Sequence, residues 1–171
     1  MEHNGLNISF AIYEDSIEKL GVTEATLPDM EYMSETISGA GIGGELEEVI
    51  TGMISAMTTT LNFRNVCPAA VSLAEPRVHK VDLRTAQQVT DSKTGDTKIV
   101  SVKHILKLKP KKTSMGKVAT ASAGELSGDY ATSYFKTTYN GKKVTEIDPA
   151  NFICYINGVD YLAEVRKALG K

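Results

Sequence analysis

Residues 39–44 read Gly-Ala-Gly-Ile-Gly-Gly and formally match the GxGxxG pattern of dinucleotide-binding proteins. In that chemistry, the glycines let the backbone approach a pyrophosphate at the N-terminus of a helix. Here Glu45, Glu47 and Glu48 follow the glycines and would repel a pyrophosphate, and no strand–helix–strand pattern surrounds the segment. We therefore expect no nucleotide and no other cofactor at this segment.

The histidines and cysteines do not form a recognisable reactive set. His3, His79 and His104 show no HxxxH or HExxH spacing, and Cys67 and Cys154 lie outside any CxxC pattern. His104 shares the apolar register of its expected strand, which favours a hydrogen-bonded core or interface histidine. No serine stands in a GxSxG elbow. We expect no catalytic residue, no metal site and no enzyme activity, and we expect both cysteines to be reduced thiols.

A basic segment is the third candidate for chemistry. Its lysines are Lys103, Lys107, Lys109, Lys111, Lys112 and Lys117. Few aromatic residues interleave with them to stack bases, and the formal net charge of the chain is -2. Whole-chain attraction to nucleic acid or to an anionic membrane is therefore not expected. In an assembly, this basic face is a candidate partner for Glu45, Glu47 and Glu48 of a neighbouring copy, because complementary charges set the register of an interface.

Length and composition are those of one globular domain. The chain has 171 residues, of which 42% are hydrophobic and 23% are charged. We treat residues 1–171 as a single domain. No run of about 18 apolar residues occurs, and the first residues lack a positive cluster followed by an apolar stretch. Neither a membrane span nor a signal peptide is expected.

Alternation of apolar and polar side chains predicts the strands of the N-terminal half. Strands are expected at residues 7–14, at two places within residues 21–37, and at residues 55–64, where a threonine-rich polar face opposes an apolar one. Residues 38–52 are expected to be an extended glycine-rich loop. This loop should be mobile in a free subunit, because glycine loses much backbone entropy on ordering and brings no side chain to pack.

The C-terminal half predicts further hairpins and two helices. Good helix formers between two prolines predict a short helix at residues 68–74, and Asp160 is a candidate cap for a terminal helix at residues 161–169. Asn140-Gly141 has the composition of a two-residue hairpin turn. The expected strands are 77–91, 98–109, 130–139, 142–148 and 152–156, with a loop at 111–129 that holds one short strand at 117–121. Many short strands with few helices predict a mainly β fold, an antiparallel β-barrel or sandwich with one short central helix and a C-terminal helix.

Three blocks of sequence go beyond a generic β domain. They are residues 25–44 (ATLPDMEYMSETISGAGIGG), 134–142 (YFKTTYNGK) and 144–162 (VTEIDPANFICYINGVDYL). The last two blocks give a strand, a turn of the type x-x-G-K, then Glu-Ile-Asp, a short apolar stretch and Asn-Gly-Val-Asp before a terminal helix. Together the blocks resemble the major tail tube protein family of contractile-tailed phages and phage-tail-like bacteriocins.

The resemblance implies a structural role. It implies one tail tube domain that assembles into stacked hexameric rings, forming a hollow conduit inside a contractile sheath, with a fold shared by type VI secretion tubes. The implied partners are the chain itself, the sheath protein, and baseplate and tail terminator proteins. DNA as a transient occupant of the lumen is left open, and a membrane is met only through the assembled device. The implied location is a virion or phage-tail-like particle, assembled in the bacterial cytoplasm.

The expected assembly surface combines the glycine-rich loop with the charged segments. In similar tubes a long loop bridges subunits or rings, and the loop at residues 38–52 is the candidate here. The candidate interface residues are Gly39, Gly41, Ile42, Gly43, Gly44, Glu45, Glu47, Glu48, Lys103, Lys107 and Lys109.

Two alternatives remain open. The first is another subunit of the same fold, such as a tail terminator, a baseplate hub component or a secretion-tube component, which would form one ring and stop. The second is a small β-barrel enzyme or ligand-binding module, for which the sequence offers no convergent acid, base or metal set.

Overall fold

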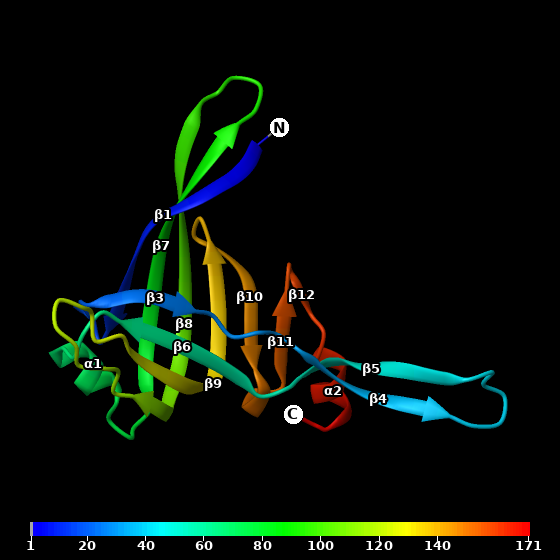
Figure 1. The fold of residues 1–171 in the computed structure, drawn as a ribbon. Helices are drawn as coiled ribbons and strands as arrows, with labels where there is room; N and C mark the ends of the chain where they lie inside the picture. Colours follow the sequence, from blue (N-terminus) through cyan, green and yellow to red (C-terminus); the bar gives the residue numbers. More distant parts are fainter. Residues whose placement is uncertain (1) are drawn as a thin grey trace.

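The computed structural model describes residues 2–171, the side chain of Asn4 excepted (Figure 1). The strands of the N-terminal half are β1 (Glu2–Glu14), β2 (Ile17–Glu18), β3 (Val22–Thr26), β4 (Tyr32–Ser38), β5 (Glu45–Ile54) and β6 (Met57–Phe63). Helix α1 (Pro68–Leu73) follows. The C-terminal half contains β7 (His79–Asp91), β8 (Thr97–Ser114), β9 (Leu126–Tyr139), β10 (Lys142–Asp148), the 3-10 turn η1 (Pro149–Asn151), β11 (Ile153–Ile156), β12 (Val159–Asp160) and α2 (Ala163–Ala168). The predicted mainly β fold with a central and a C-terminal helix is confirmed.

One antiparallel sheet folds over into two layers. Its order is β12-β11-β10-β9-β8-β7-β1-β2, and a branch of β6 and β3 starts from β9. The first half of β9 pairs with β6 and the second half with β10, so this long strand belongs to both layers. Figure 1 shows β3 and β6 crossing over β7, β8 and β9. The sandwich encloses one hydrophobic core between these layers.

The core follows from the alternation of side chains along the strands. One row of directly opposed residues runs from β7 to β11 as Val81, Leu106, Phe135, Ile147 and Cys154, and every member is buried. The crossing strand β6 turns its apolar face onto this core, as its sequence predicts. Burying one large aliphatic side chain contributes about 1.5–3 kcal/mol, so the buried side chains of this core stabilise the fold of the sandwich within a single chain.

Two local predictions are confirmed in detail. Asn140 and Gly141 have φ values of 46° and 80°, the left-handed conformation that a two-residue hairpin turn requires, and they join β9 to β10. The central helix α1 starts where Pro68 predicts, and the Cys67 thiol caps it by accepting a hydrogen bond from the Ala70 amide at 3.4 Å.

Three local predictions are wrong. The expected loop at residues 38–52 is a loop only up to residue 44, since residues 45–54 form β5 and pair with β4. No strand forms at residues 117–121; instead β8 continues to Ser114 and β9 begins earlier than expected. Asp160 lies in β12 rather than at the N-cap of the terminal helix, although its carboxylate accepts the Leu162 amide at 3.1 Å.

Candidate assembly surfaces

The strands β4 and β5 form a two-stranded hairpin, here called the arm, that stands apart from the sandwich. Among residues 2–171 it pairs with no strand of the main sheet, and it projects beside α2 in Figure 1. Every residue from Tyr32 to Thr51 is exposed, including the glycine-rich connection at residues 39–44. An isolated two-stranded hairpin is marginally stable in water, so the arm lacks the support that the sandwich provides for its own strands.

The arm has two unlike faces. Ile37 lies opposite Leu46, and alternation along the strands places Met33 and Ile50 on the same side. These four apolar side chains are between 38% and 55% exposed. We call this side the arm's apolar face. The other side carries Ser34, Thr36, Ser38, Glu45 and Glu47 with Val49.

Carboxylates gather on the arm without cations beside them in the described part of the chain. Glu35 lies directly opposite Glu48 on the arm's apolar face, and like charges in directly opposed positions destabilise a hairpin. Glu47 receives a hydrogen bond from the Ser34 hydroxyl at 2.6 Å. Within residues 2–171, no lysine, arginine or histidine forms an ion pair with Glu35, Glu45, Glu47 or Glu48.

The base of the arm is anchored to the sandwich. The Ser55 amide donates to the Glu31 carbonyl at 2.7 Å, which closes the two chain segments at the root. Gly52 is buried with φ of 80°, and a Cβ atom there would lie 2.7 Å from Leu162 Cδ2. Gly52 therefore allows the arm root to pack directly on the segment that leads into α2.

The outer face of the main sheet, on the side opposite the core, is basic. Directly opposed residues form rows across it, among them Lys80–Lys107–Tyr134 and Arg84–Lys103–Thr138–Lys143. We call this surface the basic face. Its cationic residues are Lys80, Arg84, Lys103, Lys107, Lys109, Lys136 and Lys143. Carboxylates also lie on this side of the sheet, and the row of opposed residues through Ile105 and Lys136 contains Glu18, Asp82, Glu146 and Asp160.

Asp82 and Glu146, the carboxylates at the centre of the basic face, are already paired within the chain. Asp82 lies 2.9 Å from Lys103 Nζ, and Glu146 lies 2.7 Å from Lys143 Nζ. Glu146 also accepts the Tyr134 hydroxyl at 2.8 Å. The hydrogen bond from Lys143 is the main cause that holds the pKa of Glu146 below its usual value. The predicted interface residue Lys103 therefore has an internal partner.

Other cations of the basic face remain available. Lys80, Lys107, Lys109 and Lys136 form no ion pair with a carboxylate of the described residues. Lys136 does lie directly opposite Glu146, and its charge helps to lower the pKa of that carboxyl. Lys107 lies over the Tyr134 ring, with its Nζ 5.1 Å from the ring centroid. The structure thus separates the predicted interface lysines into one that is paired and two, Lys107 and Lys109, that pair with no carboxylate of residues 2–171.

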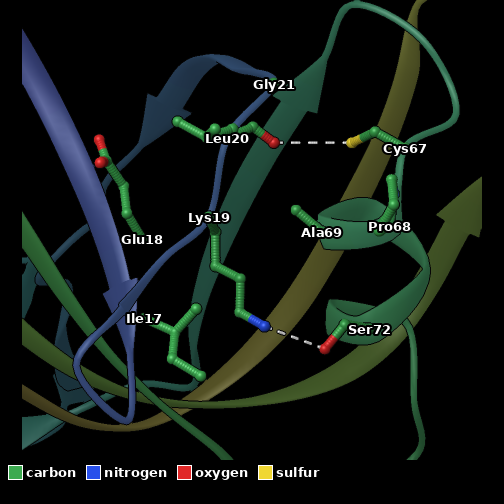
Figure 2. A pocket seen from close by; sticks show the side chains of 9 residues that line it. All are labelled: Ile17, Glu18, Lys19, Leu20, Gly21, Cys67, Pro68, Ala69 and Ser72. Atoms are coloured by element: carbon green, nitrogen blue, oxygen red, sulfur yellow. Dashed lines mark hydrogen bonds between the residues drawn. The ribbon is translucent and has the colours of Figure 1, made fainter.

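A pocket opens between the β2 segment and α1 (Figure 2). Its walls come from residues 17–21 and from the start of α1, and Figure 2 shows Lys19 extending between them toward Ser72. The Lys19 ammonium donates to the Ser72 hydroxyl at 3.1 Å, and the Cys67 thiol faces the Leu20 carbonyl at 3.6 Å. These polar atoms tie two segments together, and the exposed Ile17 and Leu20 leave apolar surface at the mouth.

A buried ionic network lies behind this pocket. His79 Nδ1 contacts Glu14 Oε1 at 2.5 Å, and Lys19 and Arg77 lie 3.2 Å and 3.1 Å from the same carboxylate. His79 Nε2 contacts the Glu75 carbonyl at 3.0 Å. Because both ring nitrogens face acceptors, this arrangement is fully bonded when His79 carries both protons and Glu14 is ionised.

The network offsets the cost of burying Glu14. Burial by itself raises the pKa of Glu14, but the hydrogen bonds from His79 and Lys19 and the nearby charges of His79 and Arg77 outweigh it, so the pKa lies below its usual value. Sequence reasoning missed this network, although a signal exists. Alternation along the strand places Glu14 on the same side as the apolar residues Phe10 and Ile12, and it places His79 on the same side as Val81. A charged group on the apolar side of a strand requires a buried partner.

His104 makes structural contacts on the main sheet. It packs in parallel on Phe135 with ring centroids 5.9 Å apart and shares a hydrogen bond with the Thr137 hydroxyl at 2.9 Å. Burial lowers its pKa. The prediction of a hydrogen-bonded histidine at this position is confirmed. In the described part of the chain, no three histidine, cysteine or acidic side chains gather as metal ligands. No helix in residues 2–171 is long and apolar enough to cross a membrane.

Fold and surfaces together define a class of protein, a β-sandwich that carries an exposed arm and a basic outer face. The comparisons with known proteins make this specific. The family model described as phage tail tube protein FII matches residues 8–170, and the chain belongs to this family. The tail tube protein of Escherichia phage P2 is 26% identical over 147 residues, which cover 85% of this chain and 84% of that protein. The chain is therefore a structural subunit of a tail tube.

A solved structure supports the fold. The sheath/tube terminator of an extracellular contractile injection system (PVC), determined by electron cryo-microscopy in its extended state, aligns with a TM-score of 0.50. The alignment has 11% sequence identity and covers 77% of this chain and 94% of that one. At this identity the likeness shows the shared fold.

Proposed function

We propose that copies of this chain associate into hexameric rings that stack into the hollow tube of a contractile tail. The observation that carries the proposal is the arm: in a tail tube family member, it exposes an apolar face and a cluster of carboxylates that its own sandwich does not cover. Surfaces of this kind mark sites of protein association. Ordering a marginally stable hairpin against a neighbour would also make growth depend on an existing ring.

The proposed contacts follow from the arm and the basic face. At the basic face the contacts involve Lys107 and Lys109, together with Lys103, which also pairs with Asp82 of its own subunit. At the arm the contact residues are Gly39, Gly41, Ile42, Gly43, Gly44, Glu45, Glu47 and Glu48. The tube would lie inside a sheath, end at baseplate and terminator proteins, and be assembled in the host cytoplasm. Membership of the tail tube family and the likeness in fold to a sheath/tube terminator support these partners.

Single-ring termination is the second candidate function, because the solved structure with a similar fold is a terminator. A terminator forms one ring and stops, whereas a tube subunit continues to stack. The two functions therefore differ in whether assemblies of the purified chain grow in length.

Electron microscopy of the purified chain tests the proposal, with size-exclusion chromatography over a concentration series. Hollow rods of uniform diameter that lengthen with concentration are the expected result. Single rings at every concentration would support the terminator function instead. A monomer that stays monomeric even when preformed baseplates are added would contradict both.

A further inference from the structure

We propose that the arm of one subunit docks on the basic face of a second copy, with the opposed pair Glu35 and Glu48 placed against Lys107 and Lys136. This inference rests on the proposed function, because it specifies which surfaces meet when copies associate. Glu35 lies on the arm's apolar face and forms no ion pair within the described part of its own subunit.

Charge complementarity selects this partner. The arm concentrates Glu35, Glu45, Glu47 and Glu48 without one counter-ion among residues 2–171, while the formal net charge of the chain is only -2. Cations without an ion-pair partner among residues 2–171, including Lys107 and Lys136, lie on the basic face of the same chain. A chain that segregates its charges onto two surfaces is complementary to its own copies, and such complementarity fixes the register of an interface and excludes wrong partners.

The two charge pairs are spaced closely enough for each carboxylate to meet one ammonium group. Glu35 and Glu48 are directly opposed across a strand pair, so their Cβ atoms lie about 4.5–5.5 Å apart. Lys136 of β9 lies directly opposite Ile105 of β8, and Ile105 is two residues before Lys107 along β8. The two lysines are therefore diagonal neighbours, about 7–8 Å apart. Two ammonium groups on long flexible stems reach both carboxylates and remove the repulsion between them.

The apolar side chains of the arm suit the same surface. Between the cations the basic face presents half-buried Ile105, and the ring of Tyr134 lies beside it beneath Lys107. Met33, Ile37, Leu46 and Ile50 of an incoming arm would pack on Ile105 and on the aliphatic stems of the lysines.

Nucleic acid fits the basic face less well than a second copy. Its tyrosines are covered by cations of the same chain: Arg84 lies 4.5 Å from the Tyr13 ring centroid, and Lys143 lies 3.9 Å from that of Tyr155. These rings are therefore not open as platforms on which bases would stack. Phosphate contacts alone would remain.

The proposed contact joins unlike surfaces. An arm on one subunit and a basic face on the next form a head-to-tail interface when each subunit contacts two different neighbours, and this arrangement closes into a ring or continues as a filament. Two copies that instead exchanged arms reciprocally would form a closed two-fold dimer, which electron microscopy distinguishes from rods. Each subunit then uses its own arm once and offers its own basic face once.

Charge reversal in two separate variants tests the docking. The arm variant carries Glu35→Lys and Glu48→Lys, and the face variant carries Lys107→Glu and Lys136→Glu. Each variant alone should lose the rods that the wild-type chain forms. Mixing the two in equal amounts should restore rods of alternating composition, because each arm again meets a face of opposite charge. Circular dichroism confirms that both variants are folded, and restoration itself shows that neither has failed to fold.

A matched control reverses two lysines of β8 that lie outside the proposed contact. Lys111→Glu with Lys112→Glu changes the net charge as much as the face variant does, and this control should form rods like the wild type. Loss of rods in the control would overturn the proposal by making net charge the cause. Rods from the face variant alone, or no rods from the mixture, would also overturn it. A face variant that assembles but loses salt-sensitive binding of duplex DNA would assign the basic face to nucleic acid instead.

If the wild-type chain forms no assembly, the proposed function fails independently of this test. If the wild type forms rods and the variants do not behave as described, only the docking assignment fails.

Discussion

The sandwich and the arm differ in whether cations of the same chain pair with their carboxylates. Glu14 is buried in the sandwich, where His79, Lys19 and Arg77 surround it. Glu35 and Glu48 face each other on the arm with no cation from residues 2–171 paired to either. The sandwich therefore satisfies its buried charge internally, whereas the arm leaves charge and apolar surface uncovered within the described part of the chain. Under the proposed function, folding and assembly then depend on separate parts of this chain.

Shortening the arm should have the largest effect and should separate the two processes. Replacing residues 34–49 by Asn-Gly removes most of the exposed part of the arm but keeps the buried root at Gly52. We expect rods to disappear completely, while the thermal unfolding midpoint of the sandwich changes little, because the removed residues are all exposed. Electron microscopy and calorimetry measure the two effects. Rods of normal appearance from this variant would show that the arm is dispensable.

Disrupting the buried network should affect folding strongly. In the arm-shortened chain, which supplies a monomeric reference, His79→Ala should lower the free energy of unfolding by about 3 kcal/mol, since removing one partner leaves a buried charge poorly compensated. Urea unfolding measures this change. Lys98→Ala is the matched control: its pair with Glu2 has both side chains more than half exposed, so solvent screens the pair and a far smaller loss is expected. Equal losses in the two variants would contradict the internal role of the network.

The same network predicts how stability depends on pH. The pKa of Glu14 in the folded chain lies below its ordinary value of 4.5, so ionised Glu14 stabilises the fold above that pH. This stabilisation should fall as the pH drops below about 4.5 and through the folded-state pKa, because protonation removes the charge that His79, Lys19 and Arg77 require. Urea unfolding at several pH values measures the slope. Glu14→Gln should be less stable at neutral pH and should show a shallower acid dependence; an unchanged slope would assign the acid sensitivity to other carboxylates.

Much of the sandwich could be predicted from the sequence because its signals are local. Alternation predicted β6 and β8, the glycine-containing connection at residues 92–96 predicted β7 as the partner of β8, and Asn140-Gly141 predicted the turn between β9 and β10. Local signals were weaker in the arm. Residues 45–52 lack clear alternation, and glycines near them suggested a loop, whereas pairing with β4 across the hairpin makes them a strand.

The residues of the candidate assembly surfaces could be identified from the sequence only in part. The sequence indicated the acidic cluster and the lysines of β8, but Glu35 became a candidate only when the register placed it opposite Glu48. Lys136 likewise joins Lys107 on one surface only through the pairing of β8 with β9. Such surfaces depend on strand register, which a single sequence does not specify when both faces of a strand carry polar residues.

The junction between arm and sandwich should give the smallest effect and the sharpest test of their separation. Gly52→Ala places a methyl group 2.7 Å from Leu162 Cδ2 and forces φ of 80° on a residue that disfavours it, so we expect a loss of about 1–2 kcal/mol in the arm-shortened chain. Gly95→Ala is the matched control, since it has a similar φ of 75° and open space around it, and it should lose only the backbone part. In the full-length chain, Gly52→Ala should also slow rod growth, because shifting Leu162 changes the direction in which the arm leaves the sandwich. A variant that loses stability but assembles at the wild-type rate would show that the arm orients itself on its neighbour and not on its root.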